Sequence, residues 1–378
     1  MSGPDGGPLD DALVLGDHGR IEAVGAWRDL RHGLRCDVTD LGGSVLAPGL
    51  VNAHVHLELS HISHGLCLGQ GFLPWVQSLV PRLREPLPDE ALDAALAQIL
   101  DCGASFVADI TGRSSGAVAR SLASYGLDCW LFLEAFGFAG EMAGGPDGPC
   151  GRLLPVWAHE RVAAAGHAPY STHPELLRRA KLWSAERGRP FSLHLAEPEG
   201  EAELLRTGGG DLAEFYTRAG ILPRDFRPPG LSSVAYADSL GLLDAATLAV
   251  HCVHVDADDI HLLTARGVTV CLCPRSNARM AVGRAPWEAL LDAGTSVCLA
   301  TDGLTSNADL DLWNELRFFR AGLDRPLGLA QALAMLTFIP ARALCLAGAH
   351  GSMVPGGKAA FSILPEDVAA WPAGKIAA

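Results

Sequence analysis

Short apolar runs alternate with helical patterns along most of this chain, and this alternation constrains its fold more than any other feature. Continuous apolar runs are typical of parallel strands that are buried on both faces of a sheet. Helical patterns, including 174–188 and 258–267, separate most of the runs. Counted from residue 48, the pattern predicts eight strands, which are the run from 44 into 58, 104–111, 127–136, 161–167, 190–196, 247–254, 268–273 and 295–301.

Eight strand–helix units of roughly 37 residues each fit a (β/α)8 barrel. The predicted fold class is therefore α/β, with a TIM-like barrel over residues 48–344. A doubly wound open sheet is the alternative, but its first strand is usually followed by a Gly-rich phosphate turn. This chain has no such turn at that place.

The two ends of the chain differ from the barrel pattern. Short strands are predicted at 12–15, 21–24, 38–41 and 359–364. We expect residues 1–47 and 345–378 to form one small β-domain beside the barrel. Residues 199–245 are longer than an ordinary loop, and a long excursion after a barrel strand is often a lid or a substrate loop.

Composition excludes several partners. The chain has 29 Lys and Arg against 43 Asp and Glu, a net charge of −14, whereas a nucleic-acid partner requires a basic surface. No apolar run approaches the roughly 20 residues of a membrane helix. Met1 to Asp11 lack the basic and apolar regions of a secretion signal, and the ten cysteines form no C-x-x-C pair. We expect a cytoplasmic protein that binds neither nucleic acid nor a membrane.

Polar residues with metal-binding chemistry stand at the ends of predicted strands. His54 and His56 are two apart on a strand, so their side chains point to the same side. His194 ends the strand 190–196, and Asp302 follows the strand 295–301. Each has a structural alternative, since a lone His is often a core residue and Asp followed by Gly is also typical of a turn.

Two further positions suggest acid–base chemistry. Glu197 comes three residues after His194, where a carboxyl group would lie near a metal without binding it. His251 and His254 end the strand 247–254, and we expect one of them to be functional. We favour His251 because it leaves the strand first, with a solvated loop His as the alternative.

The combination of these residues carries more weight than any one of them. At roughly 37 residues per unit, they fall near strands 1, 5, 6 and 8, at the carboxyl ends where barrels build active sites. Three His and one Asp suit one divalent metal, with Zn²⁺ preferred and Fe²⁺ or Mn²⁺ as alternatives. A two-metal site bridged by a modified lysine is not expected, because none of the three lysines falls in a predicted barrel strand.

Several motifs resemble the amidohydrolase superfamily, and within it the mononuclear aminohydrolase (deaminase) branch. They occur in that family's order and span nearly the whole chain. The motifs are Ala47-Pro-Gly-Leu-Val-Asn-Ala-His54-Val-His56, His167-Ala-Pro-Tyr170, His194-Leu-Ala-Glu197, Val250-His251-Cys-Val-His254, Cys273-Pro-Arg-Ser-Asn277, Thr301-Asp302-Gly303 and Gly351-Ser-Met-Val-Pro-Gly-Gly-Lys358.

The resemblance implies a role for each matching position. The metal ligands would be His54, His56, His194 and Asp302. Glu197 would carry a proton to a ring nitrogen of the substrate, and His251 would orient the attacking water. Asp302 would also accept a proton from that water. Such a site hydrolyses an amidine-like ring carbon and releases ammonia.

The segments His56-Leu57-Glu58-Leu59-Ser60 and Gly71-Phe-Leu-Pro-Trp75-Val also resemble the aminodeoxyfutalosine deaminases of menaquinone biosynthesis. The resemblance implies an adenine nucleoside that carries a benzoate. Glu58, Trp75 and His167 are candidate substrate contacts, each with a structural alternative. The benzoate would require an arginine, for which Arg82 is the first candidate, with Arg84 and Arg113 as others.

Other readings stay open at this stage. The same chemistry could serve S-adenosylhomocysteine, methylthioadenosine, guanine or a triazine, or hydrolyse a cyclic amide without release of ammonia. A barrel that is only a binding scaffold is disfavoured, because all four ligands and Glu197 are present. The outer helices of a barrel could support a homodimer.

Overall fold

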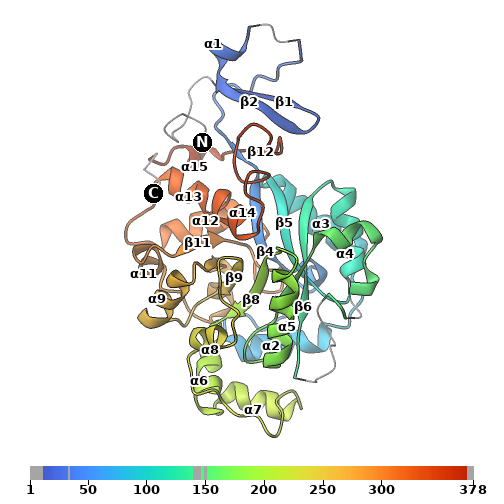
Figure 1. Ribbon diagram of the computed structural model, residues 1–378, viewed down its shortest axis with the longest axis vertical. Coiled ribbons are helices and arrows are strands. Elements are labelled where there is room, and N and C mark those ends of the chain that lie inside the picture. The colour runs from blue at the N-terminus through green and yellow to red at the C-terminus, as the bar shows by residue number, and fades with distance from the viewer. Residues whose placement is uncertain (1–11, 33–34, 139–145, 149–150, 373–378) are drawn as a thin grey trace.

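A computed structural model describes residues 12–32, 35–138, 146–148 and 151–372. Eight strands form one parallel sheet in which each strand pairs with the next along the chain (Figure 1). Sequential order with all strands parallel is the topology of a (β/α)8 barrel, so the predicted fold class is confirmed. The strands are β4 (Leu50–Val55), β5 (Ala104–Thr111), β6 (Asp128–Ala135), β7 (Val162–Gly166), β8 (Phe191–Leu195), β9 (Thr247–His251), β10 (Thr269–Leu272) and β11 (Ser296–Leu299).

The barrel closes between its first and last strands through an inserted segment. The N–H of Val51 in β4 donates to the carbonyl of Leu336 (2.8 Å), and the N–H of Leu299 in β11 donates to that of Met335 (3.2 Å). Nearer the carboxyl ends, the Asn52 side chain donates to Thr301 Oγ1 (2.8 Å) and accepts the Thr301 N–H (3.3 Å). Backbone and side-chain hydrogen bonds therefore satisfy both edges of the sheet.

Helices cover the outside of the sheet because one face of each is apolar. In α3 (Asp89–Asp101) the buried side chains recur at helical spacing, at Leu92, Ala95, Leu96 and Ile99. The predicted helices 174–188 and 258–267 correspond to α5 (Pro174–Ala185) and α9 (Ala257–Ala265). The remaining barrel helices are α2 (Phe72–Leu79), α4 (Ser115–Ser124), α10 (Pro274–Met280), α11 (Trp287–Asp292), α12 (Leu312–Ala321), α13 (Leu329–Ala334) and α14 (Phe338–Ala343).

The long excursion after β8 folds into three helices, which are α6 (Glu199–Thr207), α7 (Asp211–Arg218) and α8 (Ser233–Ser239). Tyr216 of α7 stacks on Tyr170, which follows β7, with ring centroids 5.9 Å apart. This contact belongs to a small apolar cluster that is separate from the barrel core. The helices α6 and α7 extend from one end of the molecule, opposite the β1–β2 hairpin (Figure 1). Their role as a lid stays a prediction.

The two ends of the described chain meet beside the barrel. Strand β1 (Ala12–Asp17) pairs with β2 (Arg20–Ala26), and β3 (Leu46–Pro48) pairs with β12 (Phe361–Ile363). Ile21 of β2 exchanges backbone hydrogen bonds with the turn at 356–357, each 2.8 Å long. Two short helices, α1 (Trp27–Leu30) and α15 (Glu366–Ala369), complete these regions. The boundaries of a separate β-domain stay a prediction.

The predicted strand at 38–41 is wrong. These residues form no strand, and half of the Val38 surface is exposed. The Asp40 carboxylate instead accepts the N–H of Gly42 (2.8 Å). A local hydrogen bond of this kind offers the backbone an alternative to pairing with a strand.

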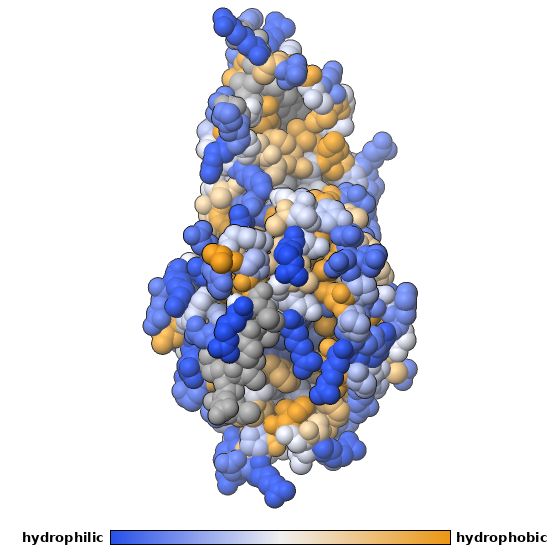
Figure 2. Space-filling view, turned by 90° about the vertical axis from the view of Figure 1, so that its right-hand side faces the viewer, coloured by the Kyte–Doolittle hydropathy of each residue, from blue (hydrophilic) through white to orange (hydrophobic). Residues whose placement is uncertain are grey.

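Polar side chains cover much of the surface, with apolar groups scattered among them on the face shown in Figure 2. Among the described residues, no helix combines the length and the apolar character that are needed to cross a membrane. The segment Met1 to Asp11, from which we expected no secretion signal, lies outside the described residues.

Candidate active site

Two histidines at the carboxyl end of β4 face each other. His54 lies in the strand and is fully buried, and His56 follows it directly. Their Nε2 atoms lie 3.2 Å apart. The spacing of two therefore brings both rings to one point, as the sequence predicts.

His194 and Asp302 reach the same point from β8 and from the end of β11. His194 Nδ1 donates to the backbone carbonyl of His167 (2.8 Å), so its Nε2 carries a lone pair in the neutral ring. That Nε2 lies 3.4 Å from His56 Nε2. Asp302 Oδ1 lies 3.7 Å from His54 Nε2 and 3.6 Å from His56 Nε2.

This donor set fits a divalent metal ion. Ligand nitrogens placed 2.0–2.1 Å from a tetrahedral Zn²⁺ lie about 3.3 Å from one another. The distances from His56 Nε2 to the Nε2 atoms of His54 (3.2 Å) and His194 (3.4 Å) are close to this value. Burial lowers the pKa of His54 and of His194 well below the ordinary value, and the neighbouring histidines lower both further. The rings are therefore neutral, which is the form that binds metal.

The backbone is strained where the site residues leave their strands. The φ angles are +52° at Ala196, +75° at His251 and +57° at Asp302, a region that residues other than glycine rarely adopt. Ala196 directly follows β8, His251 ends β9, and Asp302 comes three residues after the end of β11. Strain of this kind persists only where surrounding contacts impose it, and it gathers at functional sites.

Glu197 and His251 form a buried pair beside the histidines. His251 Nε2 lies 3.5 Å from Glu197 Oε1. The amide of Asn277 donates to His251 Nδ1 (3.1 Å), which leaves the ring proton of neutral His251 on Nε2. Burial lowers the pKa of His251 to about 4, and burial, reinforced by the nearby Asp302, raises the pKa of Glu197 well above its ordinary value.

The two histidines at the end of β9 occupy different surroundings. His251 is buried against Glu197, whereas His254 Nε2 donates to the carbonyl of Val282 (2.8 Å). This arrangement agrees with the division that we expected between them. The catalytic role of His251 stays a prediction.

Glu134, near the end of β6, was not singled out in the sequence. Its Oε1 is buried, lies 3.7 Å from His194 Nδ1 and accepts no hydrogen bond from the described residues. Burial, reinforced by Glu58, raises the pKa of Glu134 to about 8. A carboxylate near the end of an apolar strand is the signal that identified Asp302, and it could have identified Glu134.

Each of three predicted substrate contacts is held by a hydrogen bond to a different part of the protein. His167 Nδ1 is 2.5 Å from the Ser171 hydroxyl, so its imidazole is held beside His194. Glu58 Oε2 accepts the N–H of Ser114 (3.0 Å) at the end of β5. Trp75 Nε1 donates to the carbonyl of Thr305 (2.9 Å), three residues after Asp302.

Arg82, the fourth predicted substrate contact, binds other residues of the protein. Its guanidinium forms two hydrogen bonds with the carboxylate of Glu85, 2.9 and 3.0 Å long, and a third with the carbonyl of His64. Side-chain exposure of 29% for Arg82 and 43% for Glu85 makes this a surface pair. A role in substrate binding would require the pair to open, so Arg82 stays only a prediction.

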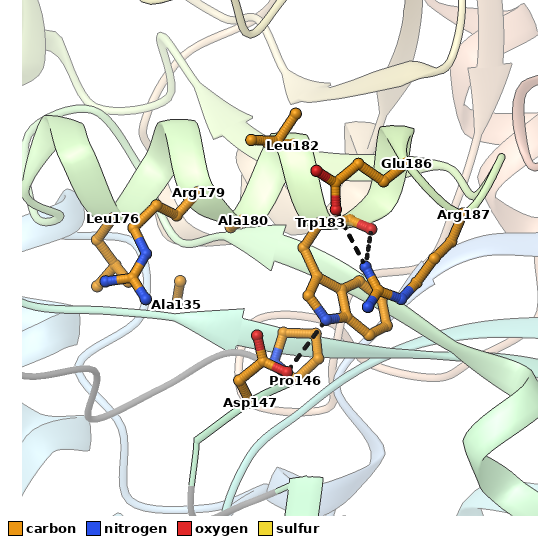
Figure 3. Close-up of a pocket in the computed structure, with 10 residues that line it drawn as sticks. All are labelled: Ala135, Pro146, Asp147, Leu176, Arg179, Ala180, Leu182, Trp183, Glu186 and Arg187. Atoms are coloured by element: carbon orange, nitrogen blue, oxygen red, sulfur yellow. Dashed lines mark hydrogen bonds and ion pairs between the residues drawn. The ribbon is translucent and has the colours of Figure 1, made fainter.

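A separate pocket of about 220 Å³ lies on the outer side of the barrel against α5 (Figure 3). The Trp183 indole donates to Asp147 (3.2 Å), and the Arg187 guanidinium lies over the indole ring at 4.2 Å. None of the predicted site residues lines this pocket. The histidine cluster at the carboxyl ends of the strands is therefore the candidate active site.

Comparison with known proteins extends over most of the chain. The sequence model of the amidohydrolase family matches residues 45–377. A 5-methylthioadenosine/S-adenosylhomocysteine deaminase of Nitratidesulfovibrio vulgaris (strain DP4) is 32% identical over 323 residues, which cover 82% of this chain and 67% of that protein. An aminodeoxyfutalosine deaminase of Deinococcus radiodurans is 30% identical over 327 residues, with 82% and 77% covered.

Among solved structures, a zinc-bound adenosine deaminase of Xanthomonas campestris superposes with a TM-score of 0.78 at 26% identity. The alignment covers 94% of this chain and 80% of that one. These matches confirm the family that the motifs predicted. The chain belongs to the amidohydrolase family and is a hydrolase that acts on carbon–nitrogen bonds.

Proposed function

We propose that this protein is a metal-dependent deaminase that hydrolyses the amino group of an adenine-type nucleoside. The reaction takes one water, breaks the bond between C6 and the exocyclic nitrogen, and yields the corresponding hypoxanthine nucleoside and ammonia. The observation that carries the proposal is the convergence of three histidine nitrogens and one Asp302 oxygen beside the buried Glu197–His251 pair. Two relatives that are named as deaminases of adenine nucleosides support this choice of base.

The ligands of one divalent ion would be His54, His56, His194 and Asp302, with Zn²⁺ preferred. When bound, such an ion supplies Lewis acidity that lowers the pKa of water toward neutrality. The neutral imidazoles and the Asp302 carboxylate suit this ion in both charge and donor type. Asp302 would in addition accept a proton from the attacking water.

Glu197 and His251 would divide the remaining proton chemistry. Burial raises the pKa of Glu197, which favours the protonated carboxyl group, and this group would donate its proton to the ring nitrogen beside the reacting carbon. The Nε2–H of His251 faces the same space and would stabilise the negative charge that develops on the attacking oxygen. Protonation of the ring nitrogen and later of the leaving nitrogen then releases ammonia.

For the side group of the nucleoside we propose aminodeoxyfutalosine first. The support is the resemblance of the segments around Glu58 and Trp75, together with the Deinococcus radiodurans relative. Trp75 would stack on the purine. The exposed Arg113, two residues after the end of β5 and next to the Ser114 that binds Glu58, would take the benzoate. Methylthioadenosine and S-adenosylhomocysteine are the second candidates, supported by the Nitratidesulfovibrio vulgaris relative.

Ammonia release from zinc-loaded protein tests the proposal. Aminodeoxyfutalosine, methylthioadenosine and S-adenosylhomocysteine are offered side by side, and the adenine-to-hypoxanthine absorbance change is followed. We expect turnover of at least one, with aminodeoxyfutalosine preferred. Inactivity on all three by protein that binds zinc would contradict the adenine-nucleoside assignment.

Replacement of the proposed proton donor tests the mechanism. Glu197→Gln should lower kcat by about 10²–10⁴-fold, the contribution that is typical of general acid–base catalysis, with the metal content unchanged. The exposed Glu199→Gln, two residues along the chain, is the matched control and should keep full activity. Wild-type turnover by Glu197→Gln would remove Glu197 from the mechanism.

A further inference from the structure

Two serine hydroxyls surround the Asp302 oxygen that points away from the histidines. Ser276 Oγ lies 2.7 Å from Asp302 Oδ2, and Ser306 Oγ lies 2.8 Å from it. The two hydroxyls are also 2.8 Å apart, so the three oxygens form a closed triangle. Both serines are buried, one in α10 after β10 and the other in the loop after β11.

The number of protons decides how this triangle is bonded. Each hydroxyl has one proton to donate, and an ionised carboxylate has none, so only two of the three edges can be hydrogen bonds. Donation to a carboxylate is charge-assisted and stronger than donation to another hydroxyl. Ser276 and Ser306 therefore both donate to Oδ2. Oδ1 stays free to face His54 and His56.

A second buried carboxylate, that of Glu315, sets the positions of the two serines. Glu315 of α12 accepts the N–H of Arg275 (3.1 Å) through Oε2 and the side-chain amide of Asn307 (2.6 Å) through Oε1. Arg275 directly precedes Ser276, and Asn307 directly follows Ser306. One side chain, itself fully buried, therefore joins the two loops that carry the hydroxyls.

We propose that Ser276 and Ser306 are positioning residues that fix which oxygen of Asp302 is presented to the metal, and that Glu315 sets their spacing. Without the two hydroxyls the carboxylate could rotate and offer either oxygen. The inference rests on the proposed function through the ligand role of Asp302. Loss of an outer partner of a ligand typically lowers metal affinity or activity by about 10–100-fold.

Zinc affinity, measured by competition with a chelator, tests this role. Ser276→Ala and Ser306→Ala should each weaken zinc binding by about 10-fold, and the double variant by up to about 100-fold. Ser184→Ala is the matched control, because Ser184 is equally buried and its hydroxyl accepts a backbone N–H at Ala164 (2.9 Å), in α5 on the outside of the barrel. Zinc affinity equal to wild type in both single variants, or an equal loss in the Ser184 control, would overturn the proposal.

Kinetics at saturating zinc separate positioning from a general loss of structure. We expect kcat of the serine variants to fall by about 10-fold, with KM unchanged, because the Asp302 carboxylate and not the substrate pocket is disturbed. The result is also separable from the proposed function. If the wild type deaminates no nucleoside but the serine variants still lose zinc affinity, the positioning role stands and the substrate assignment falls. If the wild type deaminates a nucleoside while the serine variants bind zinc normally, the substrate assignment stands and the positioning role falls.

Discussion

Glu201 offers a stability test whose size follows from its surroundings. It lies in the first turn of α6, is fully buried, and accepts the N–H of Glu197 through Oε2 (3.1 Å). Burial raises its pKa from 4.5 to about 7. The folded protein therefore keeps the proton of this carboxyl group at pH values where the unfolded chain has already lost it.

The sign and size of the effect follow from proton linkage. Between pH 4.5 and 7 the folded state binds one more proton at Glu201 than the unfolded state does, so the free energy of unfolding falls as the pH rises. The difference between the two pKa values corresponds to about 3 kcal/mol, at about 1.4 kcal/mol per pKa unit. The contribution of Glu201 is complete below pH 4.5 and is lost above pH 7.

Denaturant unfolding of wild type and Glu201→Gln at pH 5 and pH 8 measures this contribution. Glutamine cannot ionise, so the variant should lose about 2.5 kcal/mol less stability between the two pH values than the wild type does. Glu203→Gln, an exposed position in the same helix, is the control and should follow the wild type. The reasoning is refuted if Glu201→Gln keeps the pH dependence of the wild type.

Two further variants test contacts that the fold depends on. Asn277→Asp replaces the donor to His251 Nδ1 by an acceptor, so the ring proton should move to Nδ1. Because a catalytic histidine in the wrong tautomer loses most of its effect, kcat/KM in the ammonia assay should fall by about 10²–10⁴-fold. Unchanged kinetics would contradict the proton placement. Asn52→Leu leaves the buried N–H of Thr301 without its acceptor, while the Thr301 hydroxyl keeps its bond to the carbonyl of Asp302 (3.0 Å), and denaturant unfolding should show a loss of about 1–3 kcal/mol. A loss below about 0.5 kcal/mol would show that the Asn52 contact does not stabilise barrel closure.

The barrel was predictable from sequence because its strands are apolar on both faces. The run 104–111 coincides with β5, and the other seven differ from the observed strands mainly at their ends. Ends are harder to predict because the site residues lie at or just after the ends of several strands. At His251 and Ala196, for example, the backbone turns to positive φ where the apolar pattern continues.

The site was predictable where its residues stand at strand ends or at a local spacing. His54 and His56 stand two apart on a strand, and this spacing indicates that their side chains point to the same side. Glu315 gives no such signal, because a carboxylate in an amphipathic helix is ordinarily exposed. Its partners Arg275 and Asn307 lie 40 and 8 residues away, and only the fold brings them together.

Closure of the barrel and assembly of the site depend on the same contacts. The first and last strands supply His54, His56 and Asp302, and the N–H of Asp302 donates to the carbonyl of His54 (3.1 Å) across the seam. The Asn52–Thr301 pair lies directly beside this bond. The segment at 335–336 fills the other half of the seam, so these contacts join the two strands at their carboxyl ends. Loosening the Asn52 contact should therefore also separate Asp302 from the histidines and weaken metal binding as well as folding.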